Sequence, residues 1–143
     1  MRKALVVISA VLLAALVLQL YLAGLAFFST DEENLFGIHG WNGRIVLPVL
    51  VLLQIVAAAV GRAGRRTIWL TVIILLLLVF QSLLFVIVGL IFNVGPESPS
   101  VPLAASILLG LHPINGLAIM VLTLVVFIRA RRLAFPEPAP ASA

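Results

Sequence analysis

Cysteine is missing from this 143-residue chain. Its absence excludes disulfides, thiol catalysis, iron–sulfur clusters, cysteine-ligated zinc and covalently attached c-type haem. Any metal or cofactor must therefore be held by other side chains, and the chain offers two histidines and five carboxylates.

Charge is also scarce, since charged residues make up 10% of the chain, hydrophobic residues make up 64%, and the mean hydropathy is +1.30. That leaves too little polar surface to coat a water-soluble globule, so the composition predicts an integral membrane protein. The length corresponds to one domain and accommodates about four hydrophobic stretches of ~20 residues each.

Four apolar runs are long enough to cross a bilayer, at about residues 4–28, 35–60, 68–92 and 101–128. The first run continues unbroken into Phe28, well past the ~7 to 15 apolar residues of a signal peptide, so it is predicted to be a transmembrane helix. Residues 1–132 are thus predicted to form an all-α transmembrane domain. The proline-rich tail, residues 133–143, is predicted to be disordered.

The loop charges predict the topology. On one side of a four-span arrangement lie all basic residues except Arg44, namely Arg2, Lys3, Arg62, Arg65, Arg66, Arg129, Arg131 and Arg132. On the other side lie Asp31, Glu32, Glu33 and Glu97. Because basic loops are retained in the cytoplasm, both termini are expected to be cytoplasmic, in a bacterial inner membrane. Short loops make successive helices antiparallel neighbours, which predicts an up-down-up-down four-helix bundle in contact with the lipid bilayer.

A repeated pattern runs through the two halves of the chain. His39 opens the segment His-Gly-Trp-Asn-Gly, and His112 opens His-Pro-Ile-Asn-Gly, so both read H-x-x-N-G. Each is preceded, one helix earlier, by a similar segment: Leu-Val-Leu-Gln ends at Gln19 and Leu-Val-Phe-Gln ends at Gln81. The pattern indicates two tandem two-helix repeats, related by a pseudo-two-fold axis along the membrane normal.

This repeat is expected to bring both histidines near the external leaflet, on helices that can lie diagonally across the bundle. Two neutral imidazoles facing across a bundle core suit bis-histidine ligation of haem iron, so His39 and His112 are the candidate metal ligands for haem b. Gly43 and Gly116, one turn deeper, would let a flat macrocycle approach the backbone. Because both axial positions would be filled, the expected function is electron transfer.

Further residues are candidates to support such a site. Asn42 and Asn115 would hydrogen-bond the cofactor edge or a ligand helix, and such contacts fix ring orientation. Arg44 would meet haem propionates or extend to the surface. Gln19 and Gln81 would either bond between helices or reach a quinone or the haem edge.

A cofactor-free interpretation stays open beside the haem interpretation. In it the H-x-x-N-G repeats pack helices, with glycines allowing close approach, and the protein is an accessory subunit of a larger complex or a small-solute carrier. The redox interpretation implies a quinone or a redox partner protein. No serine-histidine-aspartate set or intramembrane carboxylate pair supports a hydrolase. The basic residues flank helices and form no stripe, which argues against nucleic-acid binding.

Helix lengths pose a problem for placing the histidines at one depth. From His39 to Gly61 there are 22 residues, ~33 Å of helix, whereas from His112 to Arg129 there are 17, ~26 Å. Tilt, a kink at Pro48 or a different helix end would have to absorb the difference.

The pattern resembles a small, uncharacterised bacterial family of four-helix membrane proteins. The resemblance covers nearly all of the chain up to Arg132 and rests on Gln19, His39, Gln81, Leu111, His112, Pro113 and Asn115. More distantly, the histidines of helices two and four resemble those of one half of haem A synthase and of other four-helix b-type cytochromes. That resemblance implies that His39 and His112 are axial ligands of one haem.

Overall fold

The computed structural model describes residues 1–29, 35–95 and 98–136, and every regular element in this part of the chain is helical. The helices are α1 (Arg2–Phe28), α2 (Leu35–Trp41), α3 (Leu47–Val60), α4 (Arg65–Phe92), α5 (Leu103–Leu109) and α6 (Leu111–Ala134), and a π-helical turn at Asn42–Val46 joins α2 to α3. The predicted all-α class is confirmed.

These helices form four units that are long and apolar enough to cross a membrane. They are Arg2–Phe28, Leu35–Val60, Arg65–Phe92 and Leu103–Ala134, of 27, 26, 28 and 32 residues. At about 1.5 Å per residue, each exceeds the ~30 Å of a bilayer's hydrocarbon core. The chain is a multi-pass membrane protein.

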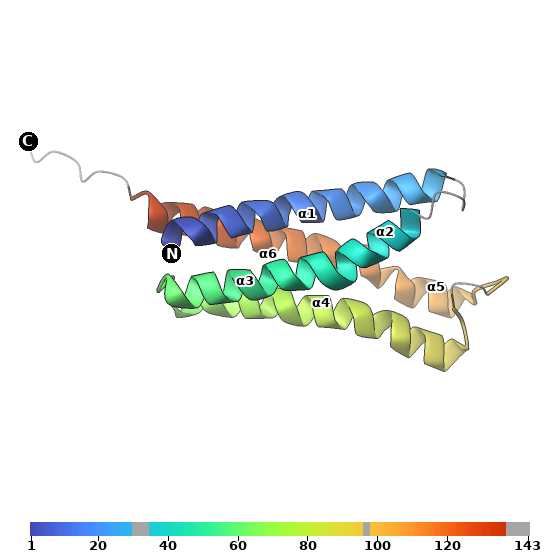
Figure 1. The fold of residues 1–143 in the computed structure, drawn as a ribbon. Helices are drawn as coiled ribbons and strands as arrows, with labels where there is room; N and C mark the ends of the chain where they lie inside the picture. The colour runs from blue at the N-terminus through green and yellow to red at the C-terminus, as the bar shows by residue number, and fades with distance from the viewer. Residues whose placement is uncertain (30–34, 96–97, 137–143) are drawn as a thin grey trace, which may run out of the picture.

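The four units form a closed bundle with a simple neighbour order. The first unit packs against α3 and α6, and α4 packs against the same two helices. Hence α1 lies opposite α4, and α3 lies opposite α6. Figure 1 shows the units side by side along one long axis, with the N-terminus, the turn between α3 and α4, and the end of α6 at the same end. We call this the basic end, because all basic residues except Arg44 lie near it.

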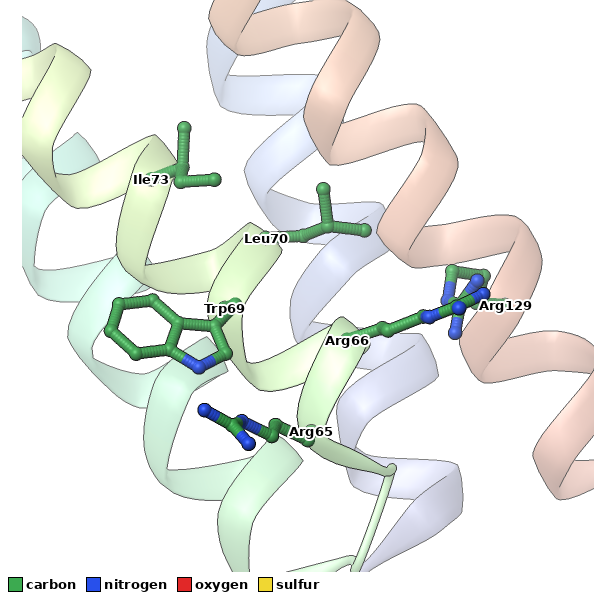
Figure 2. Close-up of a pocket in the computed structure, with 6 residues that line it drawn as sticks. All are labelled: Arg65, Arg66, Trp69, Leu70, Ile73 and Arg129. Atoms are coloured by element: carbon green, nitrogen blue, oxygen red, sulfur yellow. The ribbon is translucent and has the colours of Figure 1, made fainter.

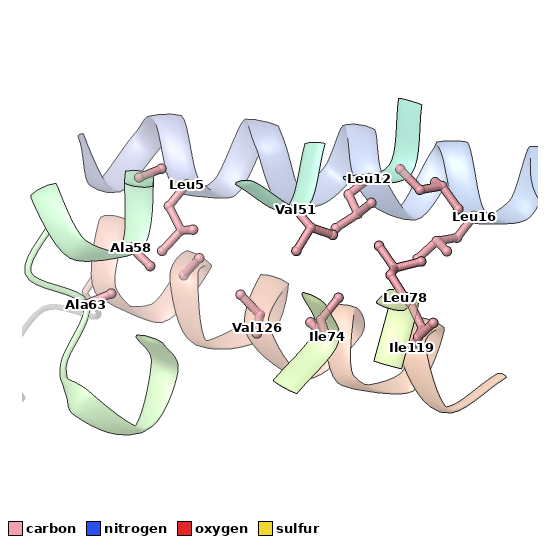
Figure 3. Close-up of a cluster of buried hydrophobic side chains, with 13 residues drawn as sticks. Leu5, Leu12, Leu16, Val51, Ala58, Ala63, Ile74, Leu78, Ile119 and Val126 are labelled. Carbon is pink, nitrogen blue, oxygen red and sulfur yellow. The ribbon is translucent and has the colours of Figure 1, made fainter. Parts of the chain in front are cut away.

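The core runs along the bundle axis and follows the sequence repeat. Leucine, isoleucine, valine and alanine side chains from all four units meet in it (Figure 3). The buried positions of α1 are Leu5, Ser9, Leu12, Leu16, Leu22 and Ala26. Those of α4 are Thr67, Thr71, Ile74, Leu78, Leu84 and Val88, each 62 residues further along the chain. Gln19 and Gln81 are separated by the same interval, so both helices present the same face to the core.

The second and fourth units match each other with one interruption. Asn42 and Asn115 are both buried and lie 73 residues apart, whereas buried Leu47 and Ile119, one turn further, lie 72 apart. The π-helical turn accounts for the extra residue, because there the backbone N–H of Leu47 bonds to the carbonyl of Asn42, five residues back. Pro48 follows directly and has no N–H to donate to the preceding turn, which favours such a bulge.

The fourth unit is interrupted instead at Gly110, between α5 and α6, near Pro113. Proline is tolerated in the first turn of α6, because N–H groups there have no intrahelical partner. Four predicted helix ends differ from the structure. The first helix begins at Arg2 rather than at residue 4, and the fourth begins at Leu103 rather than at residue 101. The third helix begins at Arg65 rather than at residue 68, and the fourth continues to Ala134 rather than ending at 128.

The longer α6 resolves the difference in depth between the histidines. From His112 to the end of α6 at Ala134 there are 22 residues, and from His39 to the end of α3 at Val60 there are 21. The tail was predicted to start at residue 133, but helix covers its first two residues. Residues 137–143, and residues 30–34 and 96–97 of two predicted loops, lie outside the described part of the chain.

Candidate functional site

His39 and His112 lie close together in the half of the bundle away from the basic end. Their ring centroids are 6.1 Å apart and their planes make an angle of 62°. His39 lies on α2 and His112 on α6, which belong to opposite units of the bundle. The predicted diagonal arrangement therefore does bring the two imidazoles together, and both rings are partly buried.

In the first half of the chain, His39 bonds to Gln19, which in turn bonds to Asn42. The Nδ1 atom of His39 lies 3.1 Å from the backbone oxygen of Gln19, and Nε2 lies 3.1 Å from the side-chain nitrogen of Gln19. Asn42 donates from Nδ2 to the side-chain oxygen of Gln19 at 2.7 Å and to the carbonyl of Ala15 at 3.2 Å. We call Gln19, His39 and Asn42 the first triad.

The second half repeats this arrangement with Gln81, His112 and Asn115, which we call the second triad. The side-chain nitrogen of Gln81 bonds to Nδ1 of His112 and donates to the His112 carbonyl at 3.0 Å. Asn115 donates to the Gln81 side-chain oxygen and, at 3.0 Å, to the carbonyl of Leu77. In each triad the asparagine thus bonds to the carbonyl four residues before the glutamine, so the repeat is preserved in the hydrogen bonds.

The two triads differ in which ring nitrogen faces the amide. A carbonyl can only accept, so neutral His39 carries its proton on Nδ1, and its Nε2 lone pair accepts from Gln19. In His112 the nitrogen facing the amide donor is Nδ1, which leaves the proton of the neutral ring on Nε2. The two halves therefore share a backbone arrangement, but their histidines carry the proton on different ring nitrogens.

Sequence reasoning missed the aromatic neighbour of the second histidine. The Phe85 ring lies 4.9 Å from the ring of His112 at a steep angle. It follows Gln81 by one helical turn on α4, and that spacing was the available signal. The corresponding residue of α1 is Ala23, so only one histidine has such a neighbour.

Arg44 lies at the edge of this site. Its side chain runs back along the helix, and Nε donates to the Gly40 carbonyl at 3.2 Å. This direction leads away from the basic end and toward the opposite membrane surface, as expected for a long side chain that carries its charge out of the bilayer. Arg44 is exposed and makes no contact with either triad in the described hydrogen bonds.

The two glycines of the repeats differ in their surroundings. A Cβ atom at Gly43 would lie 2.9 Å from the side-chain nitrogen of Gln19, whereas one at Gly116 would meet nothing within 4 Å. The space at Gly43 is therefore filled by the Gln19 amide, which hydrogen bonds to His39 and Asn42 hold in place.

We expect alanine to act oppositely at these glycines. Gly43→Ala must displace the Gln19 amide, so the free energy of unfolding should fall by about 1–3 kcal/mol. Gly116→Ala enters open space and replaces a poor helix former, so stability should stay unchanged or rise by up to about 1 kcal/mol. Denaturation of each variant with SDS in mixed micelles measures both, and equal effects of the two substitutions would contradict the assignment.

A second buried polar contact lies nearer the basic end, between α1 and α3. Gln54 on α3 donates to the Ser9 hydroxyl on α1 at 2.9 Å, and both side chains are fully buried. The side-chain oxygen of Gln54 has no hydrogen-bond partner among the described residues. The contact joins α1 to α3.

The donor atoms available at the triads restrict what they can hold. Among the described residues, no group of three or more histidine, cysteine, aspartate or glutamate side chains gathers. A closed structural zinc site takes four such ligands, so the pair His39 and His112 does not form one. Two neutral imidazoles do suit a metal whose other ligands come from a macrocycle.

Comparisons with known proteins give one match. Residues 19–89 are similar to a family described as "Family of unknown function (DUF6220)". The matched segment covers just under half of the chain and runs from Gln19 through the whole first triad to beyond Gln81. No curated protein and no solved structure matches the chain.

Proposed function

We propose that the protein is a membrane b-type cytochrome that holds one haem between His39 and His112 and transfers electrons. The observation that carries this proposal is the 6.1 Å between the two ring centroids, across the bundle. Metal–nitrogen bonds of about 2 Å on either side, together with the half-width of each ring, add up to roughly this separation.

The first triad supports the proposal through the tautomer it selects. Gln19 holds the Nδ1 proton of His39 with its backbone carbonyl, which leaves the lone pair on Nε2. Metal-ligating histidines typically donate their second ring N–H in this way, and the contact fixes ring orientation. To present Nε2 as a ligand, His39 has only to release the side-chain amide of Gln19.

The second histidine needs a larger rearrangement. Its Nδ1 accepts from the Gln81 amide, so His112 offers a lone pair only after Gln81 releases Nδ1, because a proton moved from Nε2 to Nδ1 would face the amide N–H groups. The buried Asn115 donates to the Gln81 side-chain oxygen. His39 and His112 would hold the haem, which would supply one-electron transfer, with quinol or a redox protein as the proposed electron donor.

The test is the absorption spectrum of detergent-purified protein expressed with added haem precursor, oxidised and then reduced with dithionite. A sharp α-band on reduction, with about one haem per chain by pyridine haemochrome assay, is the expected result. A colourless, folded protein that takes up no haem on titration would refute the proposal.

A cofactor-free role is the second candidate, and a specific observation favours it. In both triads the glutamine already bonds the histidine and the asparagine bonds the glutamine, so each of these side chains has a hydrogen-bond partner without a ligand. Such a network would join neighbouring helices in an accessory subunit or a small-solute carrier. The same spectrum separates the two candidates, because this role requires no chromophore.

A further inference from the structure

A cavity of about 440 Å³ opens between α4 and α6 at the basic end, far from the two triads. Five of its lining residues belong to α4 and one to α6, and they are Arg65, Arg66, Trp69, Leu70, Ile73 and Arg129 (Figure 2). We call it the arginine pocket.

Three arginines line this pocket, and no carboxylate of the described residues lies beside them. The Arg65 side chain lies beneath Trp69 (Figure 2). Arg66 extends from α4 toward α6, where Arg129 lies (Figure 2). Residues 1–29, 35–95 and 98–136 contain no acidic residue at all. Like charges this close repel one another, especially beside a low-dielectric membrane interior, so an anion in the pocket would relieve a real electrostatic cost.

One of the three guanidinium groups is held in position by the protein itself. Arg129 donates from Nε to the hydroxyl of Thr67 at 3.0 Å, and Thr67 is fully buried. This bond uses one edge of the guanidinium and leaves its terminal nitrogens to donate elsewhere. The planar guanidinium group of arginine carries paired N–H donors that match the oxygens of a phosphate group. Those oxygens can accept several hydrogen bonds at once.

The remaining wall of the pocket is apolar and faces outward. Trp69 is 53% exposed and Ile73 is 40% exposed, and they follow Arg65 at successive turns of α4, toward the middle of the membrane. A ligand that fits both parts has an anionic head at the membrane surface and a hydrocarbon chain below it. This description fits an anionic phospholipid better than a water-soluble phosphate.

The internal repeat provides a comparison within the same chain. The positions that correspond to the arginine pocket, 62 residues earlier in α1 and 72 earlier in α3, are Lys3, Ala4, Val7, Ile8, Val11 and Ala57. They include one cation instead of three and no tryptophan. The arginine cluster therefore does not follow from the duplicated helix packing but belongs to the second half alone.

We propose that the arginine pocket binds the phosphate headgroup of an anionic phospholipid, with an acyl chain along Trp69 and Ile73. Basic pockets between transmembrane helices on the cytoplasmic side are a recognised mode of binding such headgroups. The positive-inside rule predicts that this end of the bundle lies at the cytoplasmic leaflet of the membrane, which contains anionic lipids.

The test uses the full chain with Trp41→Phe, which leaves Trp69 as the single tryptophan. The protein is reconstituted in phosphatidylcholine vesicles containing a minor fraction of phosphatidylglycerol, and either lipid is supplied with brominated acyl chains that quench tryptophan fluorescence. The quenching of Trp69 by brominated phosphatidylglycerol should correspond to a local mole fraction of this lipid about ten times its mole fraction in the vesicle. Brominated phosphatidylcholine should quench only in proportion to its mole fraction.

Matched variants separate the pocket from general surface charge. Arg65→Gln/Arg66→Gln/Arg129→Gln should abolish the enrichment. Arg2→Gln/Lys3→Gln/Arg62→Gln, which removes the same charge from the same end, should retain it. If the first triple variant does not fold, Arg65→Gln/Arg66→Gln serves instead, because it keeps the bond between Arg129 and Thr67. Arg131 and Arg132 are avoided because they line a second, smaller cavity of about 270 Å³.

Three results would overturn the proposal. The first is quenching that follows mole fraction for both lipids. The second is equal loss of enrichment in the pocket variant and the control variant, which would show attraction to general surface charge only. The third is displacement of phosphatidylglycerol by inorganic phosphate, which would assign the pocket to a free anion.

Discussion

Replacing either histidine, by His39→Ala or His112→Ala, is expected to remove the haem chromophore completely. In the proposed cytochrome each imidazole would be one of the two protein ligands of the haem iron, and the chain has no third histidine to take its place. Loss of supporting contacts alone typically weakens metal sites 10–100-fold, so loss of a ligand should exceed about 100-fold. Pyridine haemochrome assays on the two purified variants measure the remaining haem.

The matched control for this experiment is Phe85→Leu. The Phe85 ring lies 4.9 Å from His112 but carries no ligating atom, so this variant disturbs packing at the same place and should keep about one haem per chain. Circular dichroism and gel filtration establish that all variants are folded. A chromophore that survives in both alanine variants would show that haem is held elsewhere, and equal loss in Phe85→Leu would show that packing alone explains the result.

The second large effect concerns the register of the helices rather than the site. Deleting Leu117 from α6 should destabilise the protein by about 4 kcal/mol or more, or prevent folding. Asn115 and Ile119 are buried one α-helical turn apart, and losing one residue between them turns the rest of the helix by about 100°. Buried Thr123, Val126 and Ala130 would then leave the core relative to the second triad. SDS denaturation and the yield of monodisperse protein measure the effect.

A deletion at the corresponding place in the first half should have a much smaller effect. There the π-helical turn carries one residue more than an α-helix needs between Asn42 and Leu47. Deleting the exposed Ile45 together with Pro48→Met reproduces the spacing of α6, where Met120 stands at the position of Pro48. The variant should stay within about 1 kcal/mol of the parent protein. Equal loss from both deletions would show that the π-helical turn is not a removable insertion.

The histidine pair illustrates how far sequence reasoning reaches into the candidate site. The repeated H-x-x-N-G pattern and the matching glutamines were sufficient to select all six residues of the two triads. The pattern contained no sign that Gln19 would bond His39 through both its backbone and its side chain. Nor did it indicate that the tautomers would differ between the halves, because a tautomer depends on which atom of the neighbouring helix faces the ring.

The arginine pocket shows the opposite case. Arg65, Arg66 and Arg129 were recognised only as topological flanks, since a charge near a helix end is explained by the positive-inside rule alone. The approach of Arg66 to Arg129 depends on the contact between α4 and α6 and on the extension of α6 to Ala134, past its predicted end (Figure 2). A cavity is a property of packed surfaces, and linear spacing does not describe it.

The sequence by itself determined the number of spanning helices, their apolar composition, the separation of charge and the duplication. These are local properties, because helix formation in lipid follows from apolar length and from the need of every backbone N–H and C=O for a partner within the segment. Only the tertiary structure decided the neighbour order, the π-helical turn that restores register before Leu47, and the 6.1 Å between the imidazoles. Those depend on how side chains from helices far apart in sequence fill one shared core, and a rotation of one residue is enough to change them.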